Sequence, residues 1–320
     1  MRRTEIPGTD LRPAVLCMGG GAISREDDDA LVFSLLDAYR GLGGNFFDSA
    51  NIYGKWLPSG RNACDANIGR WLRRAGGRDG LIIATKAAHP PLADMSHSRL
   101  GRGDLEADID ESLLALGCGA IDLLYLHRDD PSVPVEAIVD DLNDFVKMGK
   151  IRYFAASNWT PARIAEAQAY AAKSGKMGFA ANQVRWSYAV CDKDSFDIPL
   201  TETMDEAALH YHRESGLAAI AYESQARGFF QKYAAAGAAP PALAKAYGAP
   251  ANAGRFERAS RLARELGAKV GDVALGYVLN QPFATVAIIG GRTVEQLRDS
   301  ATAADLRLTA EQIAYLRADG

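Results

Sequence analysis

The stretch NFFDSANIY, residues 45 to 53, decides how the fold and the chemistry of this chain are interpreted. Asn45, Phe46 and Phe47 are typical of a short buried strand, and Asp48 follows them where a further apolar residue is expected. Tyr53 comes five residues later, beyond the end of that strand. An isolated ion in an apolar layer costs several kcal/mol, so a buried Asp48 requires a partner of opposite charge.

Seven other short apolar runs resemble the one that ends at Asp48. They are rich in β-branched residues and nearly continuous in apolar character, as in parallel strands that are covered on both faces. The eight expected strands span residues 15–18, 45–48, 81–85, 121–126, 151–155, 179–184, 217–221 and 286–289.

Amphipathic segments that are typical of helices separate these runs. Ser24 is the expected N-cap of a helix whose first turn is acidic and which ends near Gly41. Three further helices are expected over residues 104–116, stopped by Gly117, over residues 134–148, and after Thr160-Pro161.

Eight alternations of strand and helix in 320 residues predict an α/β fold, a (β/α)8 TIM barrel that forms a single domain over residues 1–320. A short N-terminal β-hairpin and extra helices or loops are expected in addition, and a doubly wound sheet is the alternative. Two segments depart from the alternation. Residues 87–103 are expected to form a long loop, and the Ala-, Pro- and Gly-rich residues 234–254 either a mobile linker or a lid over a ligand.

The composition excludes several classes of partner. A net charge of −4 and a pI near 5.8 give no basic excess, so neither nucleic acid nor an anionic membrane is expected. The four cysteines lack CxxC spacing, and His210 and His212 would point to different faces of a helix, so no metal is expected. No apolar run suits a membrane span or a signal peptide. These features predict a cytoplasmic protein whose partner is a small molecule.

The polar residues at the ends of the expected strands indicate a reaction site, because the carboxyl ends of barrel strands carry the chemistry. Asp48, Lys86 and His127 would project from three adjacent strands toward one point, and Tyr53 would lie over it. We expect Asp48 and Lys86 to neutralise each other.

An ammonium group about 4 Å from a phenol favours the phenolate by about 4 kcal/mol at an effective dielectric of about 20, which corresponds to at most about 3 pKa units. We therefore predict that Lys86 lowers the pKa of Tyr53 toward neutral pH, while Asp48 holds Lys86 in place. His127 would donate a hydrogen bond to a carbonyl oxygen. This arrangement suits the protonation of an alkoxide as it forms, or the reverse step.

At these residues the sequence resembles the aldo-keto reductase superfamily. The expected tetrad of Asp48, Tyr53, Lys86 and His127 lies within the blocks FDSANIYG, IATKA and LYLHRDD. Further blocks that resemble the family are GKIRYFAASNW, ANQVRWS, AIAYESQARGFF and AIIGGRTVEQLRDS. The resemblance covers nearly the whole chain and implies a (β/α)8 barrel that binds NADP(H) in an extended form and transfers a hydride between the nicotinamide and a carbonyl.

The resemblance also implies which residues bind the cofactor. Ser157, Asn158 and Gln183 would hold the carboxamide, Tyr222 would stack on the nicotinamide ring, and Arg292 would meet the 2′-phosphate. By position, the implied cofactor-binding residues are Gly20, Gly21, Asp48, Ser157, Asn158, Gln183, Tyr222, Ser224, Gln225, Gly228, Gly290, Gly291, Arg292, Thr293, Gln296, Asp299 and Ser300.

The substrate pocket is expected to include His127 and an aromatic wall made by Trp56 and Trp186. Glu223 departs from the family pattern, in which a serine is common, and a carboxylate near the pyrophosphate is expected to pair with Arg227 or to point away.

The predicted function is the NADPH-dependent reduction of an aldehyde or ketone to an alcohol, with Tyr53 as the general acid or base. The first alternative is an NADP-dependent sugar or alcohol dehydrogenase that uses the same site. The second is a cofactor-binding regulatory subunit. The expected partner is thus a small carbonyl compound or a sugar.

Overall fold

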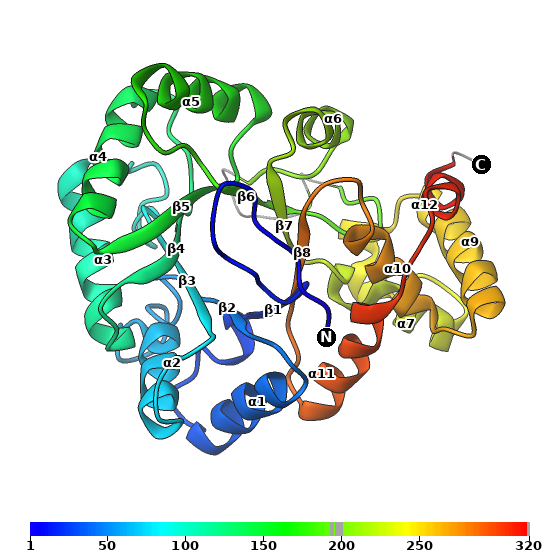
Figure 1. Ribbon diagram of the computed structural model, residues 1–320. Coiled ribbons are helices and arrows are strands. Elements are labelled where there is room, and N and C mark those ends of the chain that lie inside the picture. The colour runs from blue at the N-terminus through cyan, green and yellow to red at the C-terminus, as the bar shows by residue number, and fades with distance from the viewer. Residues whose placement is uncertain (193–194, 196–200, 319–320) are drawn as a thin grey trace.

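A computed structural model describes residues 1–192, 195 and 201–318, and within them the chain forms a closed barrel of parallel strands (Figure 1). The strands are β1 (Leu16–Gly19), β2 (Phe46–Asp48), β3 (Ile82–Ala87), β4 (Ile121–Leu126), β5 (Ile151–Ser157), β6 (Ala181–Arg185), β7 (Ala218–Tyr222) and β8 (Thr285–Ile289). They pair in chain order, and β8 pairs with β1. The (β/α)8 barrel is therefore confirmed, and the doubly wound sheet is excluded.

Helices surround the barrel as an outer layer (Figure 1). Their bounds are α1 (Asp29–Gly41), α2 (Ala63–Arg74), α3 (Arg102–Leu116), α4 (Val135–Lys147), α5 (Pro161–Ser174), α6 (Glu206–Ser215), α7 (Phe229–Ala236), α8 (Ala244–Tyr247), α9 (Ala251–Leu266), α10 (Val270–Leu279), α11 (Val294–Ala301) and α12 (Ala310–Arg317). Single 3-10 turns cover Gly20–Ala22, Ala226–Gly228, Pro241–Leu243 and Thr302–Asp305. None of the described helices is long and apolar enough to cross a bilayer.

The N-terminal residues fold back on themselves and close one end of the barrel. Arg3 and Ala14 form an antiparallel bridge, and Ile6 N donates to Leu11 O at 3.2 Å. Ile6 and Leu11 are buried in the cluster of side chains that fills the barrel interior, together with residues such as Phe46 at the start of β2. The expected N-terminal hairpin is thus present as a bridged turn that acts as the floor of the barrel.

The period of two along each strand explains which residues reach the open end. Successive side chains of a strand point to opposite faces, so a residue two positions after an interior residue also faces the interior. The interior cluster contains Phe46, Ala84, Tyr125, Ala155, Ala181 and Ile220. Two positions onward, at the carboxyl ends of the same strands, the residues are Asp48, Lys86, His127, Ser157, Gln183 and Tyr222.

Two helix ends agree with the expected capping residues and one does not. Thr160 accepts a hydrogen bond from Arg163 N at the start of α5, and Gly117 ends α3 with a φ of 64°. The predicted cap at Ser24 is wrong, because α1 begins at Asp29 and the carboxylate of Asp28 accepts from Leu31 N at 2.9 Å. The hydroxyl of Ser24 instead donates to Gly20 O, which closes the turn after β1.

Residues 234–254 are folded and packed, so the expectation of a mobile linker is wrong. Apart from the end of α7, they form the turn Pro241–Leu243, helix α8 and the start of α9. Tyr247 is buried, and its hydroxyl donates to Glu223 Oε2 at 2.7 Å. Asn252 Nδ2 donates to Tyr247 O at 2.7 Å. The segment therefore packs against the loop that follows β7.

Replacement of two helical glycines by alanine is expected to change the stability of the protein in opposite directions. A Cβ on Gly69 in α2 would lie 2.2 Å from Ala115 O and 2.8 Å from Leu116 O of α3, and backbone atoms cannot rotate away. Gly69→Ala should lower the free energy of unfolding by about 2 kcal/mol, the usual scale of overpacking. Gly103→Ala in the first turn of α3, where a Cβ meets nothing within 4 Å, should raise it by about 0.5 kcal/mol.

Urea unfolding followed by circular dichroism compares the two variants with the parent protein. A Gly69→Ala variant that is as stable as the Gly103→Ala variant would contradict the close contact between α2 and α3.

Candidate active site

A buried ion pair lies at the centre of the site. Asp48 ends β2 and Lys86 lies near the end of β3, its neighbour in the barrel. Lys86 Nζ donates to Asp48 Oδ2 at 2.6 Å and to Ser49 O at 2.7 Å. Gln183 Nε2 donates to the other carboxylate oxygen of Asp48 at 2.8 Å. Both ions are at least 97% buried, so the partner that a buried Asp48 requires is Lys86.

The turn after β2 carries Tyr53 to the same point. Tyr53 N donates to Ala50 O at 2.9 Å, and the following Gly54 adopts a φ of 100° that favours glycine. Lys86 Nζ lies 4.9 Å from the centroid of the Tyr53 ring. Gly20 allows this placement, because a Cβ there would lie 2.8 Å from Tyr53 Cδ2. The predicted neighbourhood of acid, ammonium and phenol is therefore present.

The predicted direction of the pKa shift of Tyr53 is wrong. Burial of the phenol raises its pKa above the ordinary value, and this effect exceeds the lowering by the Lys86 ammonium, while the Asp48 carboxylate raises the pKa further. The Lys86 ammonium alone would lower this pKa, but the buried phenolate also loses its hydration. Burial alone would lower the pKa of Lys86, but Asp48 and Tyr53 outweigh it and the pKa is raised. Tyr53 is thus protonated and Lys86 charged at neutral pH.

His127 lies directly after β4 and completes the expected tetrad in space. Its ring centroid is 5.8 Å from that of Tyr53 and 4.7 Å from that of His89. Burial, followed by the positive charges of Arg128 and Lys86, holds the pKa of His127 well below its usual range. Burial likewise lowers the pKa of His89 to about 4. Both imidazoles are therefore neutral near pH 7, and each carries one N–H to donate.

The two tryptophans of the expected substrate wall lie in different places. Trp56 is 54% exposed at the rim, and its ring centroid is 6.0 Å from that of Tyr53. Trp186 does not join this group, because it is one position beyond Arg185 and therefore on the outer face of the barrel. Its buried ring packs in the outer core, stacked on Phe283 at 6.1 Å. Trp186 as a wall of the pocket is thus contradicted by the alternation of side chains along β6.

The four residues expected near the nicotinamide form one hydrogen-bonded group. Ser157 ends β5, and Asn158 follows with a φ of 60°, donating its backbone N–H to Gln183 O at 3.0 Å. Tyr222 Oη donates to Asn158 Oδ1 at 2.8 Å, and Asn158 Nδ2 donates to Ser157 Oγ at 3.1 Å. Gln183 also bonds Asp48, so the group is joined to the ion pair.

The loop after β7 has an unusual backbone that other side chains hold in place. Glu223, Ala226, Arg227 and Gly228 have φ values of 53°, 47°, 55° and 78°. Glu223 Oε1 accepts from Arg227 Nη2 at 2.8 Å, which is the pairing expected for this carboxylate. Its charge is therefore compensated by Arg227.

Two further residues of this loop reach toward β8 and α11. The hydroxyl of Ser224 donates to Ile288 O at 2.7 Å. Gln225 Nε2 donates to Ser300 Oγ at 3.1 Å, and Ser300 Oγ donates to Gln296 O at 2.9 Å. The residues of the two segments are thus joined into one rim over β7 and β8.

The start of α11 presents groups suited to an anion. Thr293 caps the helix by accepting from Gln296 N at 3.3 Å, and Gln296 Oε1 accepts from Arg292 N at 2.7 Å. Arg292 is exposed, and the ion pairs of the described residues do not involve it. Asp299, also expected here, is paired with Lys269.

The glycines expected beside the cofactor differ in how closely they are packed. A Cβ on Gly291 would lie 2.8 Å from the Leu297 side chain, as close as the one on Gly20 lies to Tyr53. A Cβ on Gly21 or Gly290 would meet nothing within 4 Å. Only the packed positions therefore require glycine for steric reasons.

The sequence-based prediction gives no role to two arginines of the site, and it expects His89 only as a residue of a loop or of the substrate pocket. Arg128 and Arg185 are buried at the carboxyl ends of β4 and β6, and His89 lies against His127. Arg185 is two positions beyond Gln183, so the period of two along β6 would have indicated it. Arg128 and His89 follow their strands, where no periodicity applies, and only the folded loops bring them to the site.

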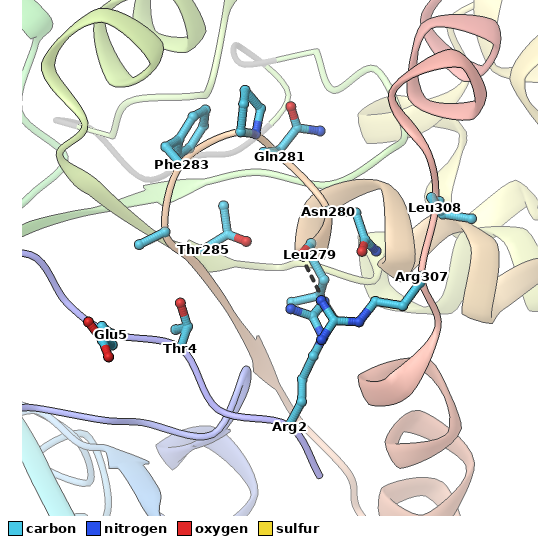
Figure 2. Close-up of a pocket in the computed structure, with 12 residues that line it drawn as sticks. Arg2, Thr4, Glu5, Leu279, Asn280, Gln281, Phe283, Thr285, Arg307 and Leu308 are labelled. Atoms are coloured by element: carbon cyan, nitrogen blue, oxygen red, sulfur yellow. Dashed lines mark hydrogen bonds between the residues drawn. The ribbon is translucent and has the colours of Figure 1, made fainter.

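Two cavities accompany the barrel. One of about 360 Å³ opens beside His89 and is lined also by Asn51, Lys55, Arg99 and Asp108. The other, of about 480 Å³, lies between the N-terminal segment and the turn from α10 to β8 (Figure 2). There, Arg2 Nη2 donates to Leu279 O at 2.8 Å. This second cavity is at the amino end of the barrel, whereas Asn51 and His89 of the first follow β2 and β3, at the end that carries the ion pair.

Comparison with known proteins agrees with this arrangement. Residues 15–318 match the model of the Aldo/keto reductase family. The uncharacterized oxidoreductase YrpG of Bacillus subtilis (strain 168) is 31% identical over 324 residues, which cover 99% of this chain and 95% of that protein. An aryl-alcohol dehydrogenase [NADP(+)] of Phanerodontia chrysosporium is 26% identical over 319 residues, covering 90% and 76% respectively.

A solved structure shows the same fold. The crystal structure of the thermostable aldo-keto reductase Tm1743, in complex with the inhibitor epalrestat, superposes with a TM-score of 0.75 at 21% identity and covers 100% of both chains. The family match over nearly the whole chain and the 31% identity to an oxidoreductase of similar length lead to one conclusion. The chain belongs to the aldo/keto reductase family and is an oxidoreductase.

Proposed function

We propose that the protein reduces an aldehyde or ketone to an alcohol with NADPH as the hydride donor. The observation that carries the proposal is the buried pair of Lys86 and Asp48 beside the protonated phenol of Tyr53, with the neutral ring of His127 next to it. This combination supplies a proton and a hydrogen bond to one oxygen atom at the open end of the barrel.

The residues around the tetrad fit a nicotinamide cofactor. The buried hydroxyl of Ser157 and the buried side-chain amides of Asn158 and Gln183 complement a carboxamide. Tyr222 offers an aromatic face. The exposed guanidinium of Arg292 beside the capped start of α11 suits a phosphate group. The reduced nicotinamide, when bound, supplies the hydride.

Tyr53 is the proposed general acid. Its raised pKa keeps the proton on the phenol at neutral pH, and an alkoxide is far more basic than a phenolate, so the transfer runs downhill once the alkoxide develops. The charge of Lys86 then stabilises the phenolate that remains. His127, being neutral, donates its N–H to the carbonyl oxygen and fixes the position of that oxygen.

The same groups would serve the reverse reaction, because the forward and reverse reactions pass through the same transition state. The relative from Phanerodontia chrysosporium is named an aryl-alcohol dehydrogenase that uses NADP(+), and the exposed Trp56 beside Tyr53 suits an aromatic ring at the rim. These points support oxidation of an alcohol as the second direction of the proposed activity.

Removal of the phenolic hydroxyl tests the proposed acid. Tyr53→Phe should reduce turnover of a reactive aldehyde by about 10²- to 10⁴-fold, the usual contribution of general acid catalysis, and leave NADPH binding in place. The matched control is Tyr125→Phe. Tyr125 lies one layer deeper in the barrel with its ring 5.6 Å from Lys86 Nζ, and its hydroxyl has no proposed role.

NADPH consumption at 340 nm gives turnover, and fluorescence titration gives the affinity for NADPH. Full reductase activity in Tyr53→Phe would exclude Tyr53 as the acid. A loss of the same size in Tyr125→Phe would show that the barrel interior, not the proton donor, had been disturbed.

The pKa shifts predict opposite pH profiles for the two directions. Reduction requires the protonated phenol, whose pKa lies above its ordinary value near 10, so turnover should be flat from about pH 6 to about pH 9 and fall only as the pH rises through that pKa. His127 stays neutral across this range and adds no acidic limb. Oxidation requires the phenolate, so its rate should rise toward alkaline pH.

Initial rates with one aldehyde and its alcohol across this range provide the measurement. A decline in reduction centred near pH 7 would mean that Tyr53 is acidified in the working enzyme.

Arg292 should set the preference for the phosphorylated cofactor. Arg292→Ala should weaken NADPH binding about 10- to 100-fold, the scale of one charge-assisted hydrogen bond, and change NADH binding little. Arg73→Ala removes another exposed arginine, from α2, and should change neither. Dissociation constants for both cofactors with each variant decide the matter, and an unchanged ratio in Arg292→Ala would remove Arg292 from the phosphate site.

A further inference from the structure

Arg128 is a buried cation without a carboxylate partner. Its side chain follows His127 and is 93% buried, yet none of the ion pairs of the described residues includes it. Nη1 donates to His127 O at 2.7 Å, and Nε has no hydrogen-bond partner. A guanidinium carries five N–H groups in a planar fork, and burial without an anion is unfavourable. The unpaired Nε–H therefore calls for an acceptor that the described part of the chain does not supply.

The groups that face Arg128 do not neutralise it. Burial lowers the pKa of Arg128, the phenols of Tyr222 and Tyr53 raise it, and the second guanidinium, Arg185, lowers it again. The neighbouring His127 carries no charge near pH 7. The ammonium of Lys86 is already paired with Asp48. The charge of Arg128 is thus not neutralised by the groups around it, next to the point where the carbonyl is proposed to react.

Arg185 belongs to the same network as Arg128. It faces the interior at the end of β6, is 96% buried, and places its guanidinium carbon 5.5 Å from the centroid of the Tyr222 ring. Tyr222 bonds Asn158, and Asn158 Nδ2 donates to His127 O at 3.4 Å, the same carbonyl that Arg128 binds. Two guanidiniums are therefore connected through two neutral side chains.

The guanidinium of Arg128 lies away from the proposed phosphate site. The exposed Arg292 and the rim formed by Ser224 and Gln225 lie over β7 and β8, where the phosphates of the cofactor are proposed to lie. Arg128 follows β4, which lies across the closed barrel from β8. It adjoins the ring of His127 instead, on the side of the reacting carbonyl.

We infer that Arg128 forms a carboxylate-binding subsite, so that the substrate is an aldehyde or ketone that carries a carboxylate a few bonds from the carbonyl. The inference rests on the proposed reduction and names its substrate class. A carboxylate accepts charge-assisted N–H bonds from a guanidinium, and Nε of Arg128 is a donor without an acceptor. The carboxylate takes no part in the reduction, so the product is a hydroxy acid.

Selectivity between charged and uncharged substrates provides the test. Two matched pairs are used: 4-oxobutanoate with its methyl ester, and 4-carboxybenzaldehyde with its methyl ester. In the parent enzyme the carboxylate should be preferred in kcat/KM, and Arg128→Gln should lower that preference about 10- to 100-fold, mainly through KM. Arg128→Lys, which keeps the charge but lacks the fork, should retain part of the preference.

Arg99→Gln is the matched control. Arg99 lines the cavity beside His89 and is already paired with Asp104 and Asp108, so its removal should leave the preference unchanged. An unchanged preference in Arg128→Gln, or a loss in Arg99→Gln instead, would overturn the inference. So would a weaker affinity for NADPH in Arg128→Gln with no change in preference, because Arg128 would then bind the cofactor. Should Arg128→Gln not fold, Arg128→Met, which places an uncharged, unbranched apolar side chain in the buried position, is measured in the same way.

A binding measurement keeps the subsite separate from the reaction. Benzoate, which has no carbonyl to reduce, should bind the parent protein in calorimetry and bind Arg128→Gln about tenfold more weakly. If no aldehyde is reduced while benzoate shows this difference, the proposed function fails and the anion site stands. If aldehydes are reduced but benzoate binds both proteins equally, the proposed function stands and the anion site fails.

Discussion

The buried ion pair between Lys86 and Asp48 is the interaction on which the rest of the site depends. Two opposite charges that are almost fully buried remain favourable only while both are hydrogen-bonded. Ser49 O and the side chain of Gln183 supply the remaining bonds and thereby join β2, β3 and β6 at one level of the barrel. Because Gln183 also lies in the proposed nicotinamide group, a change in that group would reach the ion pair directly.

The pair also determines what kind of acid Tyr53 is. A lone ammonium would favour the phenolate, but Asp48 cancels much of its field, and burial of the phenol then decides the direction. Tyr53 is therefore a proton donor that is fully protonated at neutral pH. The negative charge that appears on Tyr53 after transfer is still met by an adjacent cation, so the pair contributes most after the proton has left.

The fold was predictable from the sequence because parallel strands covered on both faces are short apolar runs, and the barrel closes around eight of them. Asp48, Lys86 and His127 were predictable because polar residues two positions beyond interior residues must face the same interior, whereas Tyr53 lies in the turn after β2, which this parity does not reach. Trp186 was misplaced because that parity was not applied to it. The pKa of Tyr53 depends on desolvation, which exists only in the folded state, and His89 and Arg128 reach the site through loops that no periodicity describes.

The hydrogen bonds of Arg2 determine when the base of the barrel can close during folding. Its guanidinium Nε donates to Ala304 O at 2.9 Å, across 302 positions of sequence, and its Nη2 bonds the end of α10 (Figure 2). Both acceptors are therefore translated long after this arginine, by 302 and 277 positions. The base of the barrel therefore cannot close before the segment that contains Ala304 has been made, and until late in synthesis the cluster of Ile6 and Leu11 lacks members such as Val286.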